Sequence, residues 1–466
     1  MRVALAFAAA VVGAPASHEV KSLPGWDGAL PSKMYSGYLD ASATKHLHYI
    51  LVERENADPA TSPTVFWFNG GPGCSSLDGF IYEHGPFRTT STAGDKLERF
   101  NYTWAKVANV VYLEAPVGVG FSYSEDSSDY GACNDDNTAD DNRNAVADFF
   151  KKFPEYVKNP FYITGESYGG IYVPTLAEAI MKAEEAGTWT GAKLHGIAVG
   201  NGCTGTEIGV CGGEREKYET KYLLGTAFIP QTLKDKITSA CDFSGSQPTG
   251  TGCSALLQEM HKTVGHINLY NVYGECISGS TDQQKVPVAG EDLLRMQSNV
   301  EGPDACIDSI AASAYFNRDD VKAALHVKNV SWRWAVCGNA PGWDYQSTRP
   351  NLPRDTYPSL VKKFRVTIYN GDWDACVPYT DNEAWTSSLG LDVSSPWQAW
   401  TYADGQVGGY KTGYTTPLGD GAFEFVTVRG GRHEVPETAP ERAFEMISAV
   451  VANRPVGAAA KDSALV

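Results

Sequence analysis

The sequence has no cluster of lysine and arginine. Lys and Arg total 38 against 55 Asp and Glu, so the formal net charge is −17 at pH 7. Proteins that bind nucleic acid depend on clustered basic side chains, because these displace the counterions that surround the phosphates. The composition therefore argues against a nucleic-acid partner.

Long apolar runs are also missing: no stretch reaches the roughly 20 apolar residues that a membrane-spanning helix needs. We therefore expect no membrane span. The first residues, Met1-Arg2, precede a short apolar run from Val3 to Val12 and the small residues Ala14-Pro15-Ala16. This pattern predicts a signal peptide over residues 1–16 and a secreted or vacuolar protein.

Ten cysteines are present, but none stands in a Cys-x-x-Cys pair, the spacing typical of zinc and redox sites. We expect disulfides formed in an oxidising compartment and no metal site. Two Asn-x-Ser/Thr sequences predict glycosylation at Asn101 and Asn329, which agrees with a signal peptide.

Other polar groups have simpler interpretations. His46 and His48 alternate along a β-like run, and such histidines are more often surface residues than metal ligands. The acidic pair Asp135-Asp136 is expected to be solvated.

The chain alternates short β-rich runs with helical patterns. Each β-run ends in a Gly- or Pro-rich turn, and we expect strands at Thr64–Phe68, Val107–Leu113, Phe161–Thr164, Ile197–Val199, Val366–Tyr369 and Phe423–Val428. Apolar spacing predicts helices over Asp140–Phe153 and Leu176–Ala186. This order predicts an α/β fold with a mostly parallel central sheet flanked by helices.

The pattern is interrupted in the middle of the chain. Residues 202–331 contain six cysteines and many Gly, Ser and Thr, and no convincing β-run followed by a turn. We expect residues 17–201 and 332–453 to form the two parts of one core, with 202–331 as an inserted disulfide-rich cap. Residues 454–466 are expected to form a loose tail.

A nucleophile is predicted at Ser167. The sequence from Gly165 to Gly169 reads G-x-S-x-G and lies between a predicted strand and a predicted helix. Glycines permit the sharp turn that exposes the serine hydroxyl, and the N-terminus of the following helix favours developing negative charge.

A serine hydroxyl needs a base, and the base needs a partner that fixes its tautomer. In α/β-hydrolase sequences the nucleophilic Ser comes first along the chain, then the acid, then His. His433 is therefore the predicted base, because it is the only one of nine histidines that follows a predicted strand and a glycine pair downstream of a candidate acid. Asp372 and Asp374 both follow the strand that ends near Tyr369, and the residues alone do not choose between them.

A glycine-rich loop follows the first strong strand. Asn69-Gly70-Gly71-Pro72-Gly73 exposes backbone N–H groups, which an oxyanion hole requires.

Together these motifs resemble the serine carboxypeptidase family, in particular its fungal, carboxypeptidase Y-like members, and the α/β-hydrolase fold that goes with it. The resemblance extends from about Gly37 to Val450 and rests on four segments in the order of the family: Phe66-Trp67-Phe68-Asn69-Gly-Gly-Pro-Gly-Cys-Ser-Ser, Gly-Glu-Ser167-Tyr-Gly-Gly, Asn-Gly-Asp-Trp-Asp374 and Arg-His433-Glu-Val-Pro.

The resemblance implies further roles. It selects Asp374 as the acid, and it implies that Gly71 and Tyr168 donate oxyanion N–H groups. It also implies a Cys74–Cys337 disulfide and a binding site for the terminal carboxylate of the substrate, formed by Asn69, Gly70, Glu83 and Glu166. The family needs no cofactor.

The expected function is a serine carboxypeptidase that releases C-terminal amino acids from peptides and proteins through an acyl-enzyme at acidic pH. Two alternatives are an acyltransferase on the same scaffold and a noncatalytic binding protein. The chain departs from the family at Arg432, where glycine often precedes the catalytic histidine, and at Gly169-Gly170, where the family often has alanine. Arg432 could affect the pKa of the base or the adjacent subsite.

Overall fold

The structure is a computed structural model that describes residues 13–89, 91–275, 309–403 and 405–458. Residues 1–12 of the predicted signal peptide and residues 459–466 of the predicted tail lie outside the described residues.

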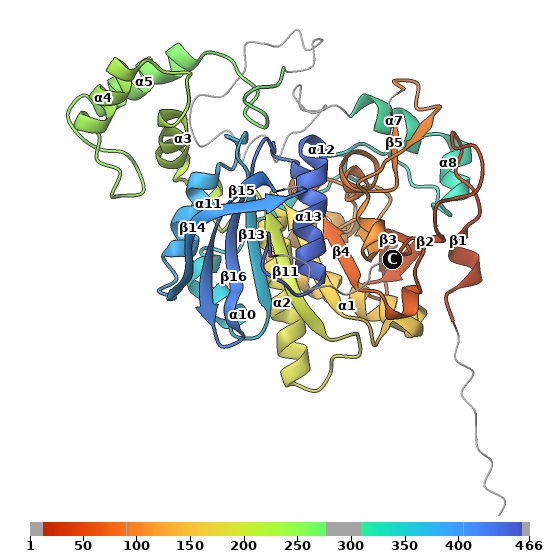
Figure 1. Ribbon diagram of the computed structural model, residues 1–466. Helices are drawn as coiled ribbons and strands as arrows, with labels where there is room; N and C mark the ends of the chain where they lie inside the picture. The colour runs from red at the N-terminus through yellow and green to blue at the C-terminus, as the bar shows by residue number, and fades with distance from the viewer. Residues whose placement is uncertain (1–12, 90, 276–308, 404, 459–466) are drawn as a thin grey trace, which may run out of the picture.

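One large mixed sheet forms the centre of the molecule (Figure 1). Its middle strands are parallel, and both margins are antiparallel. From one edge to the other the strands are β1 (Glu19–Val20), β2 (Met34–Asp40), β3 (Lys45–Val52), β7 (Asn109–Leu113), β4 (Thr64–Phe68), β10 (Phe161–Glu166), β11 (Leu194–Gly200), β13 (Arg365–Gly371), β16 (Gly419–Val428), β15 (Gln406–Thr416) and β14 (Val393–Tyr402). The predicted α/β class with a mostly parallel central sheet is confirmed.

The parallel strands in the middle of the sheet are buried on both faces. Successive side chains of a strand point to opposite sides, so each of these strands contributes to two cores. In β4, Phe66 and Phe68 enter one hydrophobic core, whereas Val65 and Trp67 enter the other. A strand that is covered on both faces is apolar along its whole length, which is why the run Thr64–Phe68 is recognisable in the sequence.

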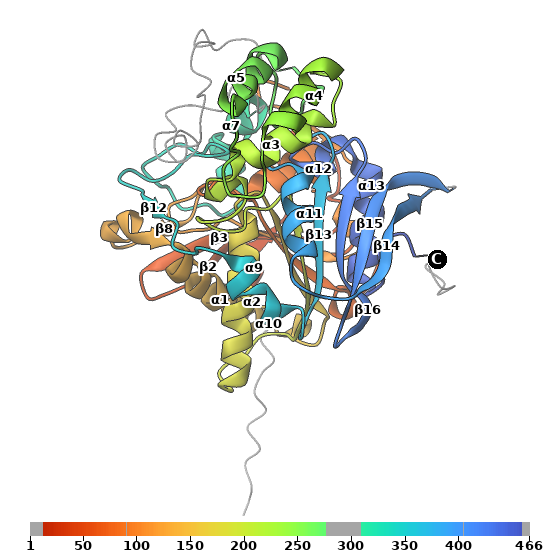
Figure 2. The ribbon, with the colours of Figure 1, turned by 90° about the vertical axis from the view of Figure 1, so that its left-hand side faces the viewer.

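Helices cover each face. α1 (Asp135–Lys152) and α2 (Gly169–Glu185) pack on the first core through apolar side chains such as Phe149 and Leu176. On the other face, α13 (Pro440–Val451) contributes Met446 and Ile447 to the second core. Figures 1 and 2 show α13 on the opposite side of the sheet from α1 and α2.

Helices after β11 project beyond the sheet (Figure 1). α3 (Arg215–Leu224), α4 (Gln231–Ala240) and α5 (Cys253–Val264) share a small core of their own, which includes Leu223, Ile237 and Met260. By contrast, α7 (Ile310–Phe316) packs in the second core of the sheet. The domain boundaries at residues 202 and 331 stay a prediction.

Three disulfides join described residues: Cys74–Cys337, Cys203–Cys211 and Cys241–Cys253. Cys133 is a buried free thiol, so the expectation that the cysteines pair as disulfides does not hold for it. Cys376 is also buried. Cys276 and Cys306 lie outside the described residues.

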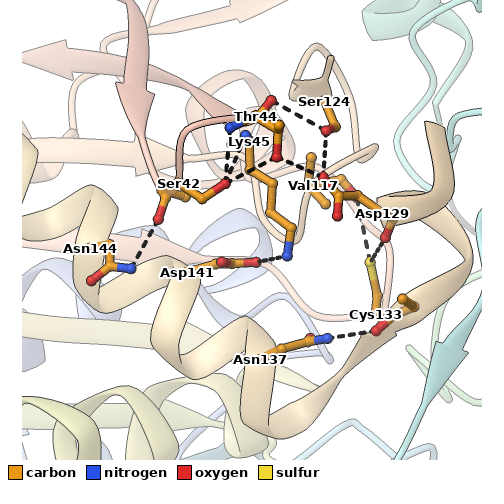
Figure 3. A network of polar contacts seen from close by, with 12 residues as sticks. Ser42, Thr44, Lys45, Val117, Ser124, Asp129, Cys133, Asn137, Asp141 and Asn144 are labelled. Atoms are coloured by element: carbon orange, nitrogen blue, oxygen red, sulfur yellow. Dashed lines mark hydrogen bonds and ion pairs between the residues drawn. The ribbon is translucent and has the colours of Figure 1, made fainter. Parts of the chain in front are cut away.

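The turn between β2 and β3 is tied to α1 by polar contacts (Figure 3). Lys45 Nζ lies 2.7 Å from Asp141 Oδ2, and Asn144 Nδ2 donates to Ala41 O at 2.9 Å. Ser124 Oγ donates to Asp129 Oδ2 at 2.6 Å in the same network. These contacts attach the antiparallel margin of the sheet to a helix of its parallel part.

Two interpretations of polar residues were wrong. His48 is fully buried, and both of its ring nitrogens have partners there: Nδ1 lies 2.8 Å from Glu114 Oε2, and Nε2 lies 2.9 Å from Ser36 Oγ. Asp135 is also buried, and its carboxylate accepts hydrogen bonds from Tyr168 Oη at 2.8 Å and Thr348 N at 2.6 Å. Within the described residues, no group of three or more His, Cys, Asp or Glu side chains could hold a metal ion.

Candidate active site

The candidate residues all lie at the edge of the sheet where the parallel strands end. β10 ends immediately before Ser167, β13 ends three residues before Asp374, and β16 ends five residues before His433. Carboxyl ends of neighbouring parallel strands lie at one edge, so the topology gathers residues that are far apart in the sequence.

Ser167 occupies a sharp turn between β10 and α2. Its φ of 59° is in the left-handed region, which is uncommon for a residue with a side chain. Its neighbours leave no room for side chains, since a Cβ on Gly165 would lie 2.5 Å from Phe68 O, and one on Gly170 would lie 2.3 Å from Cys203 O. The glycines of the motif therefore let the turn pack against adjacent backbone while Ser167 stays partly exposed.

His433 and Asp374 form a buried pair. His433 Nδ1 lies 2.7 Å from Asp374 Oδ2, and both side chains are almost fully buried. On the opposite side of the imidazole, Nε2 has no hydrogen-bond partner among the described residues. Catalytic hydrogen bonds in substrate-free enzymes are often long and shorten only when substrate binds.

Asp372 has a different partner. Its Oδ1 accepts a hydrogen bond from Gly430 N at 2.7 Å, and its backbone oxygen accepts one from Tyr222 Oη at 3.0 Å. Of the two aspartates that the residues alone left open, Asp374 is the one in contact with His433.

Two residues that the sequence did not indicate hold this pair in place. Asn201, just after β11, donates from Nδ2 to Asp374 Oδ2 at 2.7 Å and accepts from Gly371 N at 3.0 Å. Tyr270 accepts the backbone hydrogen bond of His433 at 2.9 Å, and its ring contacts the imidazole edge-on at 5.0 Å between centroids. Asn201 could have been predicted from the sequence, because it is a polar residue just after a predicted strand. No local sequence feature indicates a role for Tyr270.

The glycine-rich loop lies directly against the nucleophile turn. A Cβ on Gly70 would lie 2.3 Å from Tyr168 N and 2.8 Å from the Cβ of Ser167, so only glycine fits. Gly71 has a φ of 108°, which favours glycine as well. This packing puts the backbone of residues 70–71 beside that of Ser167 and Tyr168.

The loop is held from outside by residues that follow the cap. The Cys74–Cys337 disulfide joins it to the segment around Val336, whose carbonyl accepts from Ser75 N at 2.6 Å. The hydroxyl of Ser75 donates to the buried Glu114, which also accepts from Trp334 Nε1 at 2.9 Å.

Asn69 brings two buried acids together. Its Nδ2 donates to Glu83 Oε1 at 2.8 Å and to Glu166 Oε1 at 3.0 Å. Its Oδ1 accepts from Trp67 Nε1 at 2.7 Å and from Gly79 N at 3.0 Å, so the orientation of the amide is fixed. Glu83 ends η3 (Gly79–Glu83), a single π-helical turn, and Glu166 immediately precedes Ser167.

Burial raises the pKa of both acids. Burial and the charge of Glu434 raise the pKa of Glu83 to about 8, and burial and the charge of Glu83 raise the pKa of Glu166 well above its usual range. A carboxyl in a low-dielectric site beside another carboxyl binds its proton more tightly, because the ionised form is poorly solvated and repelled.

Two further carboxyl groups join this cluster, and sequence reasoning missed both. Burial, followed by the charges of Glu434 and Glu83, raises the pKa of Asp78 well above its usual range. Glu434 follows His433 directly and is buried. The position of Glu434 next to the base was visible in the sequence, but its approach to Asp78 is a tertiary contact.

The predicted glycosylation sites Asn101 and Asn329 are both exposed, so either side chain is accessible to a modifying enzyme. Among the described helices, none is long and apolar enough to cross a membrane.

Comparison with known proteins places this arrangement in context. A family model described as serine carboxypeptidase matches residues 24–453. Serine carboxypeptidase-like 20 of Arabidopsis thaliana is 34% identical over 480 residues, covering 93% of each chain. Serine carboxypeptidase 1 of Hordeum vulgare is 33% identical over 477 residues, covering 93% of this chain and 92% of its own. The lysosomal protective protein of Mus musculus is 33% identical over 484 residues, covering 97% of each.

A solved structure shows the same fold. The prohormone-processing carboxypeptidase Kex1 of Saccharomyces cerevisiae aligns with a TM-score of 0.67 at 19% identity, covering 94% of this chain and 96% of its own. The α/β-hydrolase fold expected from the sequence is confirmed.

Proposed function

The chain belongs to the serine carboxypeptidase family of hydrolases, and from that premise we propose that it releases single amino acids from the free C-termini of peptides through an acyl-enzyme formed on Ser167. The observation that carries the proposal is the arrangement at the sheet edge. A serine in a sharp turn after β10, a buried His–Asp pair, and a buried amide that donates to two carboxyl groups with raised pKa values lie at the same edge of the sheet.

The proposed reaction has two stages. Ser167 Oγ attacks the carbonyl carbon of the last peptide bond while His433 Nε2 takes its proton, and Asp374 holds the imidazole in the tautomer with a proton on Nδ1. The backbone N–H groups of Gly71 and Tyr168 stabilise the negative oxygen. As the C–N bond breaks, the imidazolium returns the proton to the leaving amine, and water then hydrolyses the acyl-enzyme by the same proton path.

Selection of the C-terminus is assigned to Asn69, Gly70, Glu83 and Glu166. A site that contained two ionised carboxylates would repel a third, but a protonated acid can donate a hydrogen bond to the carboxylate of the substrate. The raised pKa values of Glu83 and Glu166 support this role. No cofactor enters the proposed reaction.

C-terminal laddering tests the activity. A mixed peptide library is incubated with the protein, and the products are read by mass spectrometry, with the C-terminally amidated library and Ser167→Ala as controls. Sequential loss of single C-terminal residues from the free acids alone supports the proposal. Ester formation with an added alcohol, without release of amino acids, would instead indicate an acyltransferase.

We propose that peptide hydrolysis is fastest at acidic pH. Loss of the shared proton on the acid pair weakens binding of a free C-terminus as pH rises, whereas His433 must be neutral to act as base and limits activity at low pH. An ester substrate without a free carboxylate should therefore remain a good substrate to higher pH than the matching peptide acid. Superimposable pH profiles of kcat/KM would contradict the shared proton.

For the location we propose the secretory route, ending outside the cell or in a vacuole. The predicted signal peptide, the glycosylation sequences and the disulfides support it. Detection of a mature protein that begins after residue 16 and carries glycans at Asn101 or Asn329 would test this proposal.

A further inference from the structure

Arg432, the residue at which the chain departs from its family beside the base, forms a buried ion pair. Its guanidinium contacts the carboxylates of Glu434 and Glu437, and its side chain is only 11% exposed. The backbone N of Arg432 donates to Thr438 Oγ1 at 2.9 Å, which ties Arg432 to the last residue of α12 (Val435–Thr438). A cation is thus held next to the catalytic histidine but directed toward acids that follow it.

The ion pair lies beside the carboxyl cluster. α12 packs on η3, and Val435 shares the second core with Phe80 and Ile81 of that turn. η3 begins after Asp78 and ends at Glu83, so the residues at the start of α12 face both of these acids. The contact brings Glu434 into electrostatic range of Asp78, Glu83 and Glu166.

The charges around the cluster come from several segments of the chain. Four carboxyl groups, of Asp78, Glu83, Glu166 and Glu434, face two guanidinium groups, of Arg88 and Arg432. Arg88 donates to the backbone oxygen of Glu83 and lies over the ring of Phe100. Glu437, His433, His84, Tyr112 and Tyr369 lie at the margin of the cluster. Burial holds the pKa of His84 well below its usual range and raises the pKa values of Tyr112 and Tyr369 well above theirs.

Within this cluster Arg432 and Glu434 act in opposite directions. The positive charge of Arg432 favours the ionised form of Asp78, whereas the negative charge of Glu434 favours the protonated forms of Asp78, Glu83 and Glu166. Buried charges at short range are weakly screened, so removing one partner leaves the effect of the other uncompensated.

We propose that the Arg432–Glu434 ion pair is a specificity-determining element that sets the highest pH at which the site accepts a free C-terminal carboxylate. The inference rests on the proposed function, because it assumes that Glu83 and Glu166 bind that carboxylate. Neither Arg432 nor Glu434 needs to touch the substrate, since each acts through the proton that the acids share.

The sign of each substitution follows from the charges. Arg432→Met removes a cation, so the cluster holds its proton more tightly and binding of a free acid persists to higher pH. Glu434→Gln removes an anion, so the proton leaves at lower pH and binding fails earlier. Each displacement should be about half to one pH unit, or about threefold to tenfold in affinity at a fixed pH on the slope.

The test measures binding separately from turnover. All proteins in the binding experiment carry Ser167→Ala. Calorimetry from pH 4 to 9 measures their affinity for N-acetyl-Phe-Leu and for its C-terminal amide. The proteins compared have no further change, Arg432→Met, Glu434→Gln, or both of these substitutions. Arg432→Lys, which keeps the charge, is the matched control. The same substitutions are made on active protein, and kcat/KM for the free acid is compared with that for an ester.

The inference requires that the pH dependence of affinity for the free acid is displaced in opposite directions in the two single variants. The double variant and Arg432→Lys should stay close to wild type. Affinity for the amide should show no matching displacement. Displacements in the same direction, or equal displacements for acid and amide, overturn it. A protein that releases no C-terminal residues in the laddering experiment refutes the proposed function instead, so the two failures are distinguishable.

Discussion

At the scale of single residues, the first test concerns the nucleophile. Ser167→Ala should lower kcat by about a millionfold, because it removes the only group that forms the acyl bond. The fold should be retained, since the hydroxyl is partly exposed and fills no core space. Turnover of a blocked dipeptide, together with circular dichroism, checks both statements. Ser387→Ala on the exposed side of α11 (Tyr379–Ser387) is the control, and retention of a tenth of the activity in Ser167→Ala would refute the assignment.

The second test separates the two aspartates. Asp374→Asn should reduce kcat by about ten thousandfold, because the amide favours the wrong tautomer of His433. Asp372→Asn should cost far less, since that carboxylate accepts from Gly430 N and does not contact the imidazole. Steady-state kinetics on both variants decides the matter, and a more severe defect in Asp372→Asn would reassign the acid.

How much of the site could be predicted depends on whether its signal is local. Ser167 and His433 follow strands and stand beside glycines, so a short window of sequence is enough to indicate them. The choice of Asp374 needed the resemblance to a family. Asn201, Tyr270 and Glu434 act through contacts with residues more than 100 positions away, which no periodicity or turn signal encodes.

At the scale of elements, the buried parallel strands were predictable and the antiparallel margins were not. β4 begins and ends where the sequence indicated, because its side chains are buried on both faces. β14 has mostly exposed side chains and contains Pro396, which weakens a strand signal, so the margin it forms was missed. α1 begins at Asp135, five residues before the predicted start, because Asn134 and Asn137 cap it reciprocally.

Helix α11 carries a buried acid that should make the stability of the protein depend on pH. Asp381 of α11 accepts from Val210 N at 2.8 Å near the start of α3, and burial raises its pKa to about 7. A raised pKa means that the folded state binds the proton more tightly than the unfolded chain. The stabilising contribution is therefore complete below the unfolded pKa of 3.8 and is lost as pH rises through about 7.

Asp381→Asn should remove this dependence. The melting temperature of the variant minus that of wild type should be larger at pH 7.5 than at pH 4, since a neutral amide does not have to ionise in a buried site. Thermal unfolding at the two pH values measures the difference. Asp392→Asn, at an exposed aspartate, serves as the control, and an equal change in both variants would contradict a special role for Asp381.

At the scale of the whole molecule, the Cys74–Cys337 disulfide connects distant parts of the chain. It closes a loop of 263 residues that includes the turn at Ser167 and the helices α3 to α5. In the chain-entropy model, closing so long a loop stabilises the folded state by about 6 kcal/mol, because the unfolded chain loses conformational freedom. The same bond holds the loop that carries Asn69 and Gly71, so stability and activity should depend on it together.

The Cys74→Ala/Cys337→Ala variant should therefore unfold at a lower denaturant concentration and should also have a lower kcat/KM. The matched control is Cys241→Ala/Cys253→Ala, which opens a disulfide with a sequence separation of only 12 inside the cap core. That change should cost about 3 kcal/mol in the same model and should affect kcat/KM less, because neither cysteine borders the loop beside Ser167. Urea unfolding and kinetics on both double variants give the comparison. A larger loss of activity in the cap variant would show that the position of the residue 69–76 loop does not depend on its link to Cys337.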